Sequence, residues 1–475
     1  MAVNFKDINI GIKFGTDGWR AVIADSFTFD NVKKVANAVA QYIINNSLNP
    51  HIIIGYDTRF LAKDFAKTCA EELNIHGITT YISETYLPTP VTAFHTVNLP
   101  QKISLGIQFT ASHNPPKYCG MKLLAPYGAP ASEEVTNEIS TYLNTTIEAN
   151  KTLDKNLFLE FSSFEEYSKH LNTLINFEII KKSNLKIIYD PIFGAGQNFL
   201  DRILLEHNIN IKTIHNTLDP LFGGYLPEPK EEYLQELKTT VLKEKANVGL
   251  GTDGDSDRLG IFNEKGEYFS PNKIATMLTR HLIKNKNLKG SIARTLSTTH
   301  LLDLFAQKYS LPLIETKVGF KWLGKAMMEN DVLIAAEESG GISTKGHIPD
   351  KDAILAACLV VEMMAYEKKP LDEIYSDCLA ELGVKCFNDR FDLHLEEKNK
   401  HVFLELLQSG HIKTINNIKV KNLITSEGAK YVLEDGSWFF ARSSGTEPMT
   451  RVYFESFNLE MLEAMKRELK GLLAL

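Results

Sequence analysis

Short apolar runs alternate along the chain with longer segments whose apolar residues recur at helical spacing. Residues 51–56 form an apolar run of the length expected for a buried strand, and residues 62–76 continue with helical spacing. Residues 29–44 show the same helical spacing before this strand, and a second strand is expected near residues 79–82. Strands that alternate with helices in this way predict a doubly wound, mostly parallel α/β sheet.

The same alternation recurs further along the chain. Three more predicted strands each end in a carboxylate, at residues 185–190, 247–253 and 331–337. A recurring unit of this kind indicates duplication of an α/β domain. From about Cys386 the pattern changes to a strand-rich stretch followed by an amphipathic helix at residues 459–475, which predicts a smaller α+β domain.

Composition mainly excludes classes of partner and of structure. With 475 residues the chain is too long for one compact core, so we expect several domains. A net charge of −7 and a pI near 6.0 argue against nucleic acid or an anionic membrane as the main partner. The five cysteines form no CxxC pair, which favours reduced thiols over disulfides or a zinc site. The sequence also shows no apolar run of membrane-spanning length and no signal-peptide core, so we expect a cytoplasmic protein.

A loop of small and polar residues follows the predicted strand at residues 103–109. Ser112 and His113 lie in this loop, and Pro115 and Pro116 end it because proline cannot join a sheet or a helix interior. The loop would lie at the carboxyl end of a strand, where open α/β sheets bind their ligands. A plain turn capped by serine explains the loop equally well on its own. Arg20, near the start of the chain, follows a glycine-containing turn and offers a planar set of donors that suits phosphate.

The most informative loop contains Asp253, Asp255 and Asp257, followed by Arg258. Three carboxylates at alternate positions can converge on one hard cation, and they would repel one another without it. An EF-hand is an alternative, but Arg258 occupies the position that needs glycine and the flanking residues predict strands. Magnesium held by few protein ligands would leave room for a phosphoryl oxygen, and Arg258 would neutralise another.

Two further loops carry groups suited to a phosphorylated sugar. Glu337 and Ser339 offer a carboxylate and a hydroxyl beside two glycines, although a helix N-cap turn explains them too. His347 and Lys351 follow four residues apart and are either proton carriers or surface residues. The second loop supplies a guanidinium, hydroxyls and glycine-freed backbone N–H groups that form a cup for phosphate, namely Arg442, Ser444, Gly445 and Thr446. A serine–glycine hairpin turn explains the second loop except for its arginine.

These loops, in this order, resemble those of the α-D-phosphohexomutase superfamily, most closely its phosphoglucomutase and phosphomannomutase members, over essentially the whole chain. The resemblance implies that Ser112 is a phosphoserine and that the aspartates bind Mg²⁺ with the Ser112 phosphate as a further ligand. It implies that Glu337 and Ser339 hold sugar hydroxyls and that residues 442–448 bind phosphate. Lys122 matches a lysine near the phosphoserine, and either it, His347 or Lys351 would be the general base. The resemblance also assigns Arg294 to substrate binding, at a position where the family often has lysine. The chain departs from the family there, at Cys119, where asparagine is common, and at Ala336, where glycine is common.

The resemblance also implies an architecture and a reaction. Three related doubly wound α/β domains, residues 1–155, 156–262 and 263–384, and a smaller α+β domain, residues 385–475, would surround a central cleft. Phosphorylated Ser112 would transfer its phosphoryl group to a hexose monophosphate. The resulting 1,6-bisphosphate would reorient and return its other phosphate to the serine.

The substrate is expected to be a small sugar phosphate rather than nucleic acid or membrane. The Glu-Glu-Ser-Gly-Gly loop that begins at Glu337 favours glucose over glucosamine, with glucose 1,6-bisphosphate as intermediate and activator; a phosphomannomutase or a dual-specificity enzyme is the alternative. A phosphatase and a non-catalytic sugar-phosphate-binding protein are the competing classes. The presence of both Ser112 and a full acidic triad favours the mutase, which we expect to be a monomer or a weak homodimer.

Overall fold

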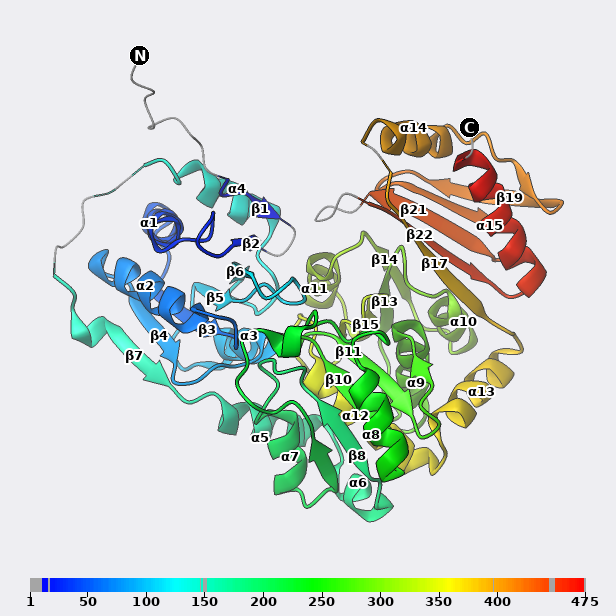
Figure 1. Ribbon diagram of the computed structural model, residues 1–475, viewed down its shortest axis with the longest axis horizontal. Coiled ribbons are helices and arrows are strands. Elements are labelled where there is room, and N and C mark those ends of the chain that lie inside the picture. Colours follow the sequence, from blue (N-terminus) through cyan, green and yellow to red (C-terminus); the bar gives the residue numbers. More distant parts are fainter. Residues whose placement is uncertain are drawn as a thin grey trace.

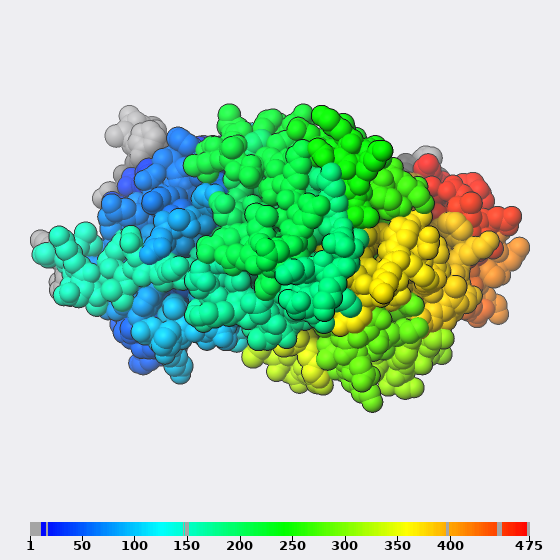
Figure 2. All heavy atoms as spheres, turned by 90° about the horizontal axis from the view of Figure 1, so that it is seen from below, coloured from blue at the N-terminus to red at the C-terminus, as the bar shows by residue number. Residues whose placement is uncertain are grey.

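The computed structural model describes residues 11–15, 18–145, 147, 152–395, 397–443 and 449–473. Within these residues the strands form four sheets, which define domains 1 to 4. Figure 1 shows the sheets following one another in chain order, with domain 1 at one end of the long axis and domain 4 at the other. The space-filling view from below shows the same order from the blue to the red end (Figure 2).

Domain 1 contains a mixed sheet with the strand order β1-β2-β6-β5-β3-β4-β7. Alternate residues of β3 belong to different cores: Ile52 and Ile54 pack with α1 and α2, whereas Ile53 packs with α3. Helices therefore cover both faces of the sheet, as predicted. The elements are β1 (Phe14–Gly15), β2 (Gly18–Val22), α1 (Phe29–Asn45), β3 (His51–Tyr56), α2 (Ala62–Ile75), β4 (Thr79–Ser83), α3 (Thr89–Asn98), β5 (Leu105–Phe109), β6 (Tyr118–Leu124), α4 (Glu133–Thr141), the 3₁₀ turn η2 (Lys155–Leu157) and β7 (Phe158–Phe161).

Domains 2 and 3 contain the next two sheets, with orders β12-β11-β10-β8-β9 and β14-β13-β15-β16. Domain 2 consists of α5 (Phe164–Leu174), α6 (Phe177–Ser183), β8 (Ile187–Asp190), α7 (Leu200–Glu206), β9 (Ile211–Thr213), η3 (Phe222–Gly224), α8 (Gln235–Glu244), β10 (Val248–Thr252), β11 (Leu259–Asn263) and β12 (Tyr268–Phe269). Domain 3 consists of α9 (Pro271–Lys284), β13 (Ser291–Thr295), α10 (Leu301–Lys308), β14 (Leu313–Thr316), α11 (Phe320–Glu329), β15 (Val332–Ala336), β16 (Ile342–Thr344), α12 (Ala353–Glu367) and α13 (Leu371–Leu382).

Two sheets extend beyond the domain limits expected from the sequence. β7 pairs in parallel with β4, so the first sheet continues past residue 155. β12 pairs with β11, so the second sheet continues past residue 262. Strand pairing, which the local pattern does not reveal, sets these limits.

The first three sheets share one topology. In the orders β4-β3-β5-β6, β9-β8-β10-β11 and β14-β13-β15-β16, the first three strands are parallel and the fourth is antiparallel. The antiparallel fourth strand makes each sheet mixed, a feature that the pattern of strands and helices did not indicate. In each sheet the chain passes from the third to the fourth strand through one loop. These equivalent loops are the serine loop (residues 110–116), the aspartate loop (residues 253–258) and the glutamate loop (residues 337–341).

Domain 4 is an antiparallel sheet of order β17-β22-β21-β20-β19-β18 with two helices, as the α+β prediction requires. It has a core of its own, formed around residues such as Phe439, Phe454 and Met465. Its elements are β17 (Phe387–Leu393), α14 (Glu397–Gln408), β18 (Thr414–Ile415), β19 (Ile418–Ile424), β20 (Ala429–Leu433), β21 (Trp438–Ser443), β22 (Thr450–Ser456) and α15 (Leu459–Leu473). Among the described helices of the chain, none is both long enough and apolar enough to cross a membrane.

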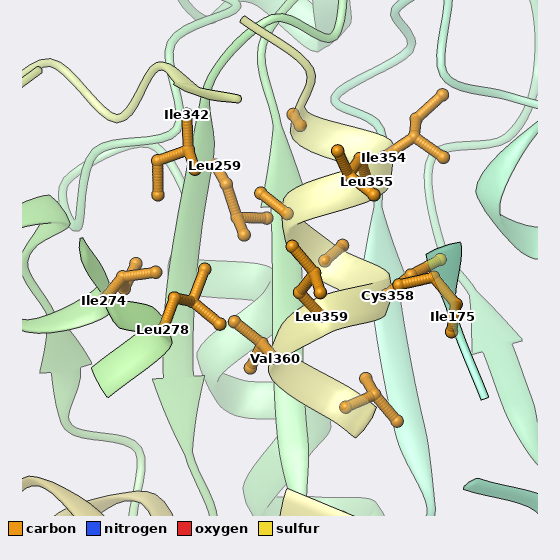
Figure 3. Close-up of a cluster of buried hydrophobic side chains, with 14 of the residues drawn as sticks. Ile175, Leu259, Ile274, Leu278, Ile342, Ile354, Leu355, Cys358, Leu359 and Val360 are labelled. Atoms are coloured by element: carbon orange, nitrogen blue, oxygen red, sulfur yellow. The ribbon is translucent and has the colours of Figure 1, made fainter. Parts of the chain in front are cut away.

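Helix α12 joins domains 2 and 3 into one core. It is apolar on all sides, and its residues from Ala353 to Ala365 are buried. Figure 3 shows Leu355, Leu359 and Val360 of this helix among side chains from the surrounding elements, including Leu259 and Ile342. A helix that is hydrophobic all round needs protein on every side, which α12 finds between the two sheets.

We expect replacement of Leu359 by alanine to destabilise this core. The side chain is 1 % exposed, so its loss leaves a cavity and costs about 2–5 kcal/mol. The matched control is Leu205→Ala, because Leu205 on α7 is 57 % exposed and its loss should change stability by no more than about 0.5 kcal/mol. Urea denaturation followed by circular dichroism measures both; equal midpoints for the two variants would contradict the assignment of α12 as a shared core helix.

Candidate functional site

The serine, aspartate and glutamate loops converge on one cleft of about 700 Å³. All four domains contribute to its walls. Domain 1 provides Arg20, His113 and Asn114; domain 2 provides Arg258; domain 3 provides Ser297, Glu337, Glu338, Ser339 and Lys351; and domain 4 provides Arg390, Trp438, Arg442, Arg451 and Tyr453. The central cleft implied by the family resemblance is therefore present.

Ser112 is buried directly before His113 and Asn114, which line this cleft, and it has a strained conformation. Its φ is 51°, in the left-handed region that non-glycine residues rarely adopt. The hydroxyl Oγ donates a hydrogen bond to Asp253 Oδ2 at 3.0 Å and lies 3.4 Å from His113 Nδ1. Gly254 allows this approach, because a Cβ on it would lie 2.8 Å from the Ser112 carbonyl oxygen. Packing of the aspartate loop against the serine loop thus points the Ser112 hydroxyl at a carboxylate.

Arg59 holds the serine loop in this shape. Its guanidinium donates to four main-chain carbonyl oxygens at 2.6–3.0 Å, those of Ser112, Asn114, Pro115 and Tyr118. Asp57 pairs with the other side of Arg59 at 3.3 Å. Burial raises the pKa of Asp57 to about 6, although Arg59 opposes the shift. Both side chains are fully buried, so this pair is part of the scaffold beneath the cleft rather than a ligand-binding group.

The three aspartates form a compact acidic cluster. Their ligand oxygens lie within 4.8 Å of one another, and all three residues are buried. Lys122 Nζ from β6 donates to Asp255 Oδ2 at 2.6 Å and to Asp257 Oδ2 at 2.7 Å. The second oxygens, Oδ1 of Asp255 and of Asp257, are buried without a hydrogen-bond partner. Oxygens that are close together, buried and unpaired fit a hard divalent cation, so these residues can hold a metal ion.

The charged groups around this cluster differ in the direction in which the protein shifts their pKa values. Burial, followed by the charges of Asp257 and Asp255, raises the pKa of Asp253 well above its usual range. Burial acts on Asp257 in the same direction, but Lys122, Lys351 and Arg258 outweigh it and lower its pKa. Burial lowers the pKa of Lys122, and the carboxylates of Asp255 and Asp257 more than compensate. Lys122 therefore remains an ammonium ion.

The pKa of the His113 imidazole is lowered, in contrast to the raised pKa of Lys122. Enclosure by the protein, followed by the charges of Arg258 and Arg20, holds its pKa well below the usual value. His113 is therefore neutral in the unphosphorylated chain, where its lowered pKa makes it a weak base.

The glutamate loop forms the next wall. Ser339 Oγ donates to Glu337 Oε1 at 2.6 Å, and burial raises the pKa of Glu337, although Lys351 opposes the shift. Glu338 accepts a hydrogen bond from Ser297 Oγ at 2.6 Å. Lys351 Nζ lies 3.3 Å from Asp257 Oδ2, so it links this wall to the aspartate loop. Carboxylates and a hydroxyl side by side provide the acceptors that sugar hydroxyls need.

Domain 4 provides an opposing basic wall. Arg442 on β21 lies directly opposite Arg451 on β22, and Arg390 on β17 comes from the next strand. Arg451 also has a carboxylate directly opposite it, Asp392 on β17, so its charge is partly balanced within the sheet. Arg390, Arg442 and Arg451 all line the cleft, and guanidinium groups are strong donors to phosphate oxygens, so this wall is a candidate anion site. Ser444, Gly445 and Thr446, predicted to join Arg442 in binding phosphate, lie outside the described residues.

Comparison with protein-family models matches four domains in order. Domain I of phosphoglucomutase/phosphomannomutase matches residues 11–150, domain II residues 165–266, domain III residues 270–382 and the C-terminal domain residues 395–472. The chain belongs to the phosphoglucomutase/phosphomannomutase family. It is thus an enzyme of the isomerase class that moves a phosphoryl group within its substrate.

The relatives agree on the family and differ in substrate. A phosphoglucomutase from Komagataeibacter xylinus is 26% identical, over 94% of this chain and 87% of its own length. A phosphoglucosamine/phosphogalactosamine mutase from Sulfurisphaera tokodaii is 28% identical, over 97% and 99%. A Thermus thermophilus protein assigned as a phosphomannomutase superposes with a TM-score of 0.85 at 28% identity, covering 98% of this chain and 99% of its own.

Two residues predicted to act in the cleft lie away from it in this phosphohexomutase. The side chain of His347 is fully buried, bonded through Nε2 to Asp352 at 2.9 Å and through Nδ1 to His170 at 3.0 Å. Arg294 is also buried, with its guanidinium paired to Asp303 and Glu315. Both residues have their polar atoms taken up within the fold, and neither lines the cleft.

Sequence reasoning missed several residues that the structure brings to the site. Arg390 and Arg451 lie on strands whose pairing with each other and with β21 is not visible in the sequence. Thr89 donates to Asp255 Oδ2 at 2.5 Å and was hidden in a turn between two prolines. Arg59 is the last residue of the polar triplet Asp-Thr-Arg that follows a predicted strand. This triplet was the only local indication in the sequence that Arg59 belongs to the site.

We expect Arg59→Lys to lower turnover and stability together. Lysine cannot donate to four carbonyls from one plane, and each unsatisfied buried group costs on the order of 1–3 kcal/mol. The control is Arg467→Lys on the exposed face of α15. Steady-state kinetics and thermal melting measure both effects; wild-type turnover in Arg59→Lys would show that the serine loop keeps its shape without the guanidinium.

Proposed function

We propose that this protein interconverts glucose 1-phosphate and glucose 6-phosphate through a phosphorylated Ser112 and a glucose 1,6-bisphosphate intermediate. The observation that carries the proposal is the hydrogen bond from Ser112 Oγ to Asp253, within a buried acidic triad whose neighbours His113 and Arg258 line the cleft. A serine in a plain turn does not require three converging carboxylates. The arginine wall opposite, with Arg442 facing Arg451, supplies a second anion site across the same cleft.

The first half-reaction transfers the phosphoryl group from Ser112 to the sugar. The Oγ–P bond breaks, a new O–P bond forms at the free hydroxyl of the hexose monophosphate, and that hydroxyl loses its proton. His113 is a suitable acceptor, because the phosphate on the neighbouring serine would raise its low pKa. Lys122, which remains charged, and Arg258 neutralise charge on the phosphoryl oxygens. Mg²⁺, held by Asp253, Asp255, Asp257 and the Ser112 phosphate, would supply further neutralisation of the transferring group.

The second half-reaction requires the bisphosphate to bind in two orientations. One phosphate lies at the serine loop while the other lies at the arginine wall of domain 4, and reorientation exchanges them. Glu337 and Ser339 line the same cleft and can accept from and donate to the sugar hydroxyls in either orientation. The acidic form of this loop supports glucose over glucosamine, with mannose phosphates as the second substrate class.

The central experiment is a coupled assay with glucose 1-phosphate, Mg²⁺ and trace glucose 1,6-bisphosphate. We expect formation of glucose 6-phosphate, and a mass spectrum in which a fraction of chains carries one phosphate. Ser112→Ala should lose both the phosphate and more than about 10³-fold of the turnover, because the covalent route is removed. Ser409→Ala, an exposed serine of domain 4, is the control.

The same assay with mannose 1-phosphate and glucosamine 1-phosphate decides the substrate. A higher kcat/KM for either of them than for glucose 1-phosphate refutes the glucose assignment. Release of inorganic phosphate faster than isomer formation identifies a phosphatase instead.

Metal binding has its own test. Asp255→Asn removes one charged ligand from the triad, so the dissociation constant for Mg²⁺, measured by titration calorimetry, should rise by at least about tenfold. Asp435→Asn, in an exposed turn of domain 4, should leave it unchanged. Equal affinities in the two variants would remove Asp255 from the set of ligands.

A further inference from the structure

Domain 4 is attached to domain 3 through a fully buried lysine. Lys430 on β20 extends from the sheet of domain 4 to the loop between β13 and α10, residues 296–300. Its Nζ donates to the Leu296 carbonyl oxygen at 2.6 Å, lies 2.9 Å from His300 Nε2, and lies 3.3 Å from Glu315 Oε2. A lysine is almost never fully buried unless its ammonium group is paired, and here all of its partners belong to domain 3.

An acidic residue of the same sheet binds the same loop. Glu455 on β22 is buried and accepts a hydrogen bond from the His300 backbone N–H at 2.7 Å and another from Trp438 Nε1 at 3.0 Å. The ring of Trp438 lies 4.5 Å from Lys430 Nζ. We call these groups, Lys430, Glu455, Leu296 and His300, the interdomain anchor.

The loop held by the anchor also contacts the sugar-binding wall. Ser297, directly after Leu296, donates to Glu338 Oε2 at 2.6 Å, and both residues line the cleft. On the other side, Lys430 is on the strand next to β21, which carries Arg442. The anchor therefore connects the glutamate loop of domain 3 with the arginine wall of domain 4 through a few consecutive residues.

The surrounding charges determine the protonation states of Lys430 and His300 in the interdomain anchor. Arg294 pairs with Asp303 and with Glu315, the residue that also faces Lys430. Burial, followed by Arg294 and Lys430, holds the pKa of His300 well below its usual range, so its ring is neutral and accepts from the lysine. Burial, followed by the charge of Arg294, lowers the pKa of Lys430 to about 8. The lysine keeps its proton at neutral pH because carbonyl, imidazole and carboxylate acceptors surround it.

We propose that Lys430 is a positioning residue of the mutase: through the interdomain anchor it sets the spacing between the arginine wall and the glutamate loop. The inference rests on the proposed function, in which a bisphosphate spans the cleft and one of its phosphates binds domain 4. Domain 4 has its own core and meets domain 3 through a small apolar cluster around Leu296 and Trp438. An interface of this kind permits domain motion unless specific contacts restrain it. Displacement of the distal phosphate site by a fraction of an ångström to one ångström would misplace the substrate at Ser112.

The test compares Lys430→Met with Lys421→Met, an exposed lysine of β19 in the same sheet. We expect Lys430→Met to raise KM for glucose 1-phosphate and the dissociation constant of glucose 1,6-bisphosphate by about tenfold, since hydrogen bonds of a charged group contribute about 1.5–3 kcal/mol. Turnover at saturating substrate should fall much less. Hydrolysis of phosphorylated Ser112 in water, which needs no distal phosphate site, should keep its wild-type rate.

Further variants and measurements separate positioning from folding. Glu455→Gln weakens the anchor from the other strand and should shift KM in the same direction, with a smaller change in melting temperature. Small-angle scattering should give a larger radius of gyration for Lys430→Met than for Lys421→Met. Unchanged KM and bisphosphate affinity in folded Lys430→Met would overturn the proposal, as would equal losses in phosphoserine hydrolysis and isomerisation. If the wild-type chain does not convert hexose phosphates, the proposed function fails, and bisphosphate affinity with scattering still decides the role of Lys430.

Discussion

The charge balance around the three buried aspartates is the constraint on which the rest of the structure depends. Carboxylate oxygens within 4.8 Å of one another repel strongly in a buried site, so the fold has to bring positive groups to them. Lys122 comes from β6 of domain 1, Arg258 from the aspartate loop itself in domain 2, and Lys351 from domain 3. The same electrostatic requirement therefore joins three domains at one point, where Asp253 accepts from the Ser112 hydroxyl and Asp257 pairs with Lys351 beside the glutamate loop.

Repetition of one sheet topology explains how three loops can meet there. Each loop links the third strand of the shared four-strand unit to an antiparallel fourth strand, so each emerges at an equivalent position of its domain. Within this shared unit the domains differ in what the loop carries: a strained serine, a set of aspartates, or a glutamate and serine pair. Domain 4 has another topology and contributes strands rather than a loop of this type, and its arginines are placed by cross-strand pairing. The site combines a triplicated scaffold with one unrelated wall.

Features that depend only on neighbouring residues could be predicted from the sequence, whereas features that depend on the pairing of distant strands could not. The serine loop, the aspartate triad and the helices around β3 follow from neighbouring residues, and the structure contains them with limits close to those expected. The antiparallel direction of the fourth strand in each sheet, the continuation of the first sheet into β7, and the pairing of Arg442 with Arg451 depend on how the strands pair. His347 and Arg294 show the converse error: their residue types suit catalysis and phosphate binding, but buried partners, Asp352 and Asp303, satisfy them within the fold. Residue type and spacing identify chemistry only where the fold leaves a polar group unsatisfied, as it does for Oδ1 of Asp255 and of Asp257.

The two sides of the cleft are supported by different apolar cores and therefore have different mechanical roles. One continuous core includes the face of domain 1 beneath α3, helix α12 and the sheets of domains 2 and 3. The aspartate and glutamate loops and Lys351 belong to the domains that share this core, whereas the strands beside the serine loop pack mainly in the second core of domain 1. The close approach of Gly254 to Ser112 leaves no room between the aspartate and serine loops. Domain 4 has a separate core, and the proposed reaction assigns its arginines to the distal phosphate. Reorientation of a bisphosphate requires release at one end without loss of the geometry at the other. A tightly packed transfer side and a separately folded phosphate wall, joined through the apolar cluster around Leu296 and Trp438 and through the interdomain anchor, would satisfy both requirements.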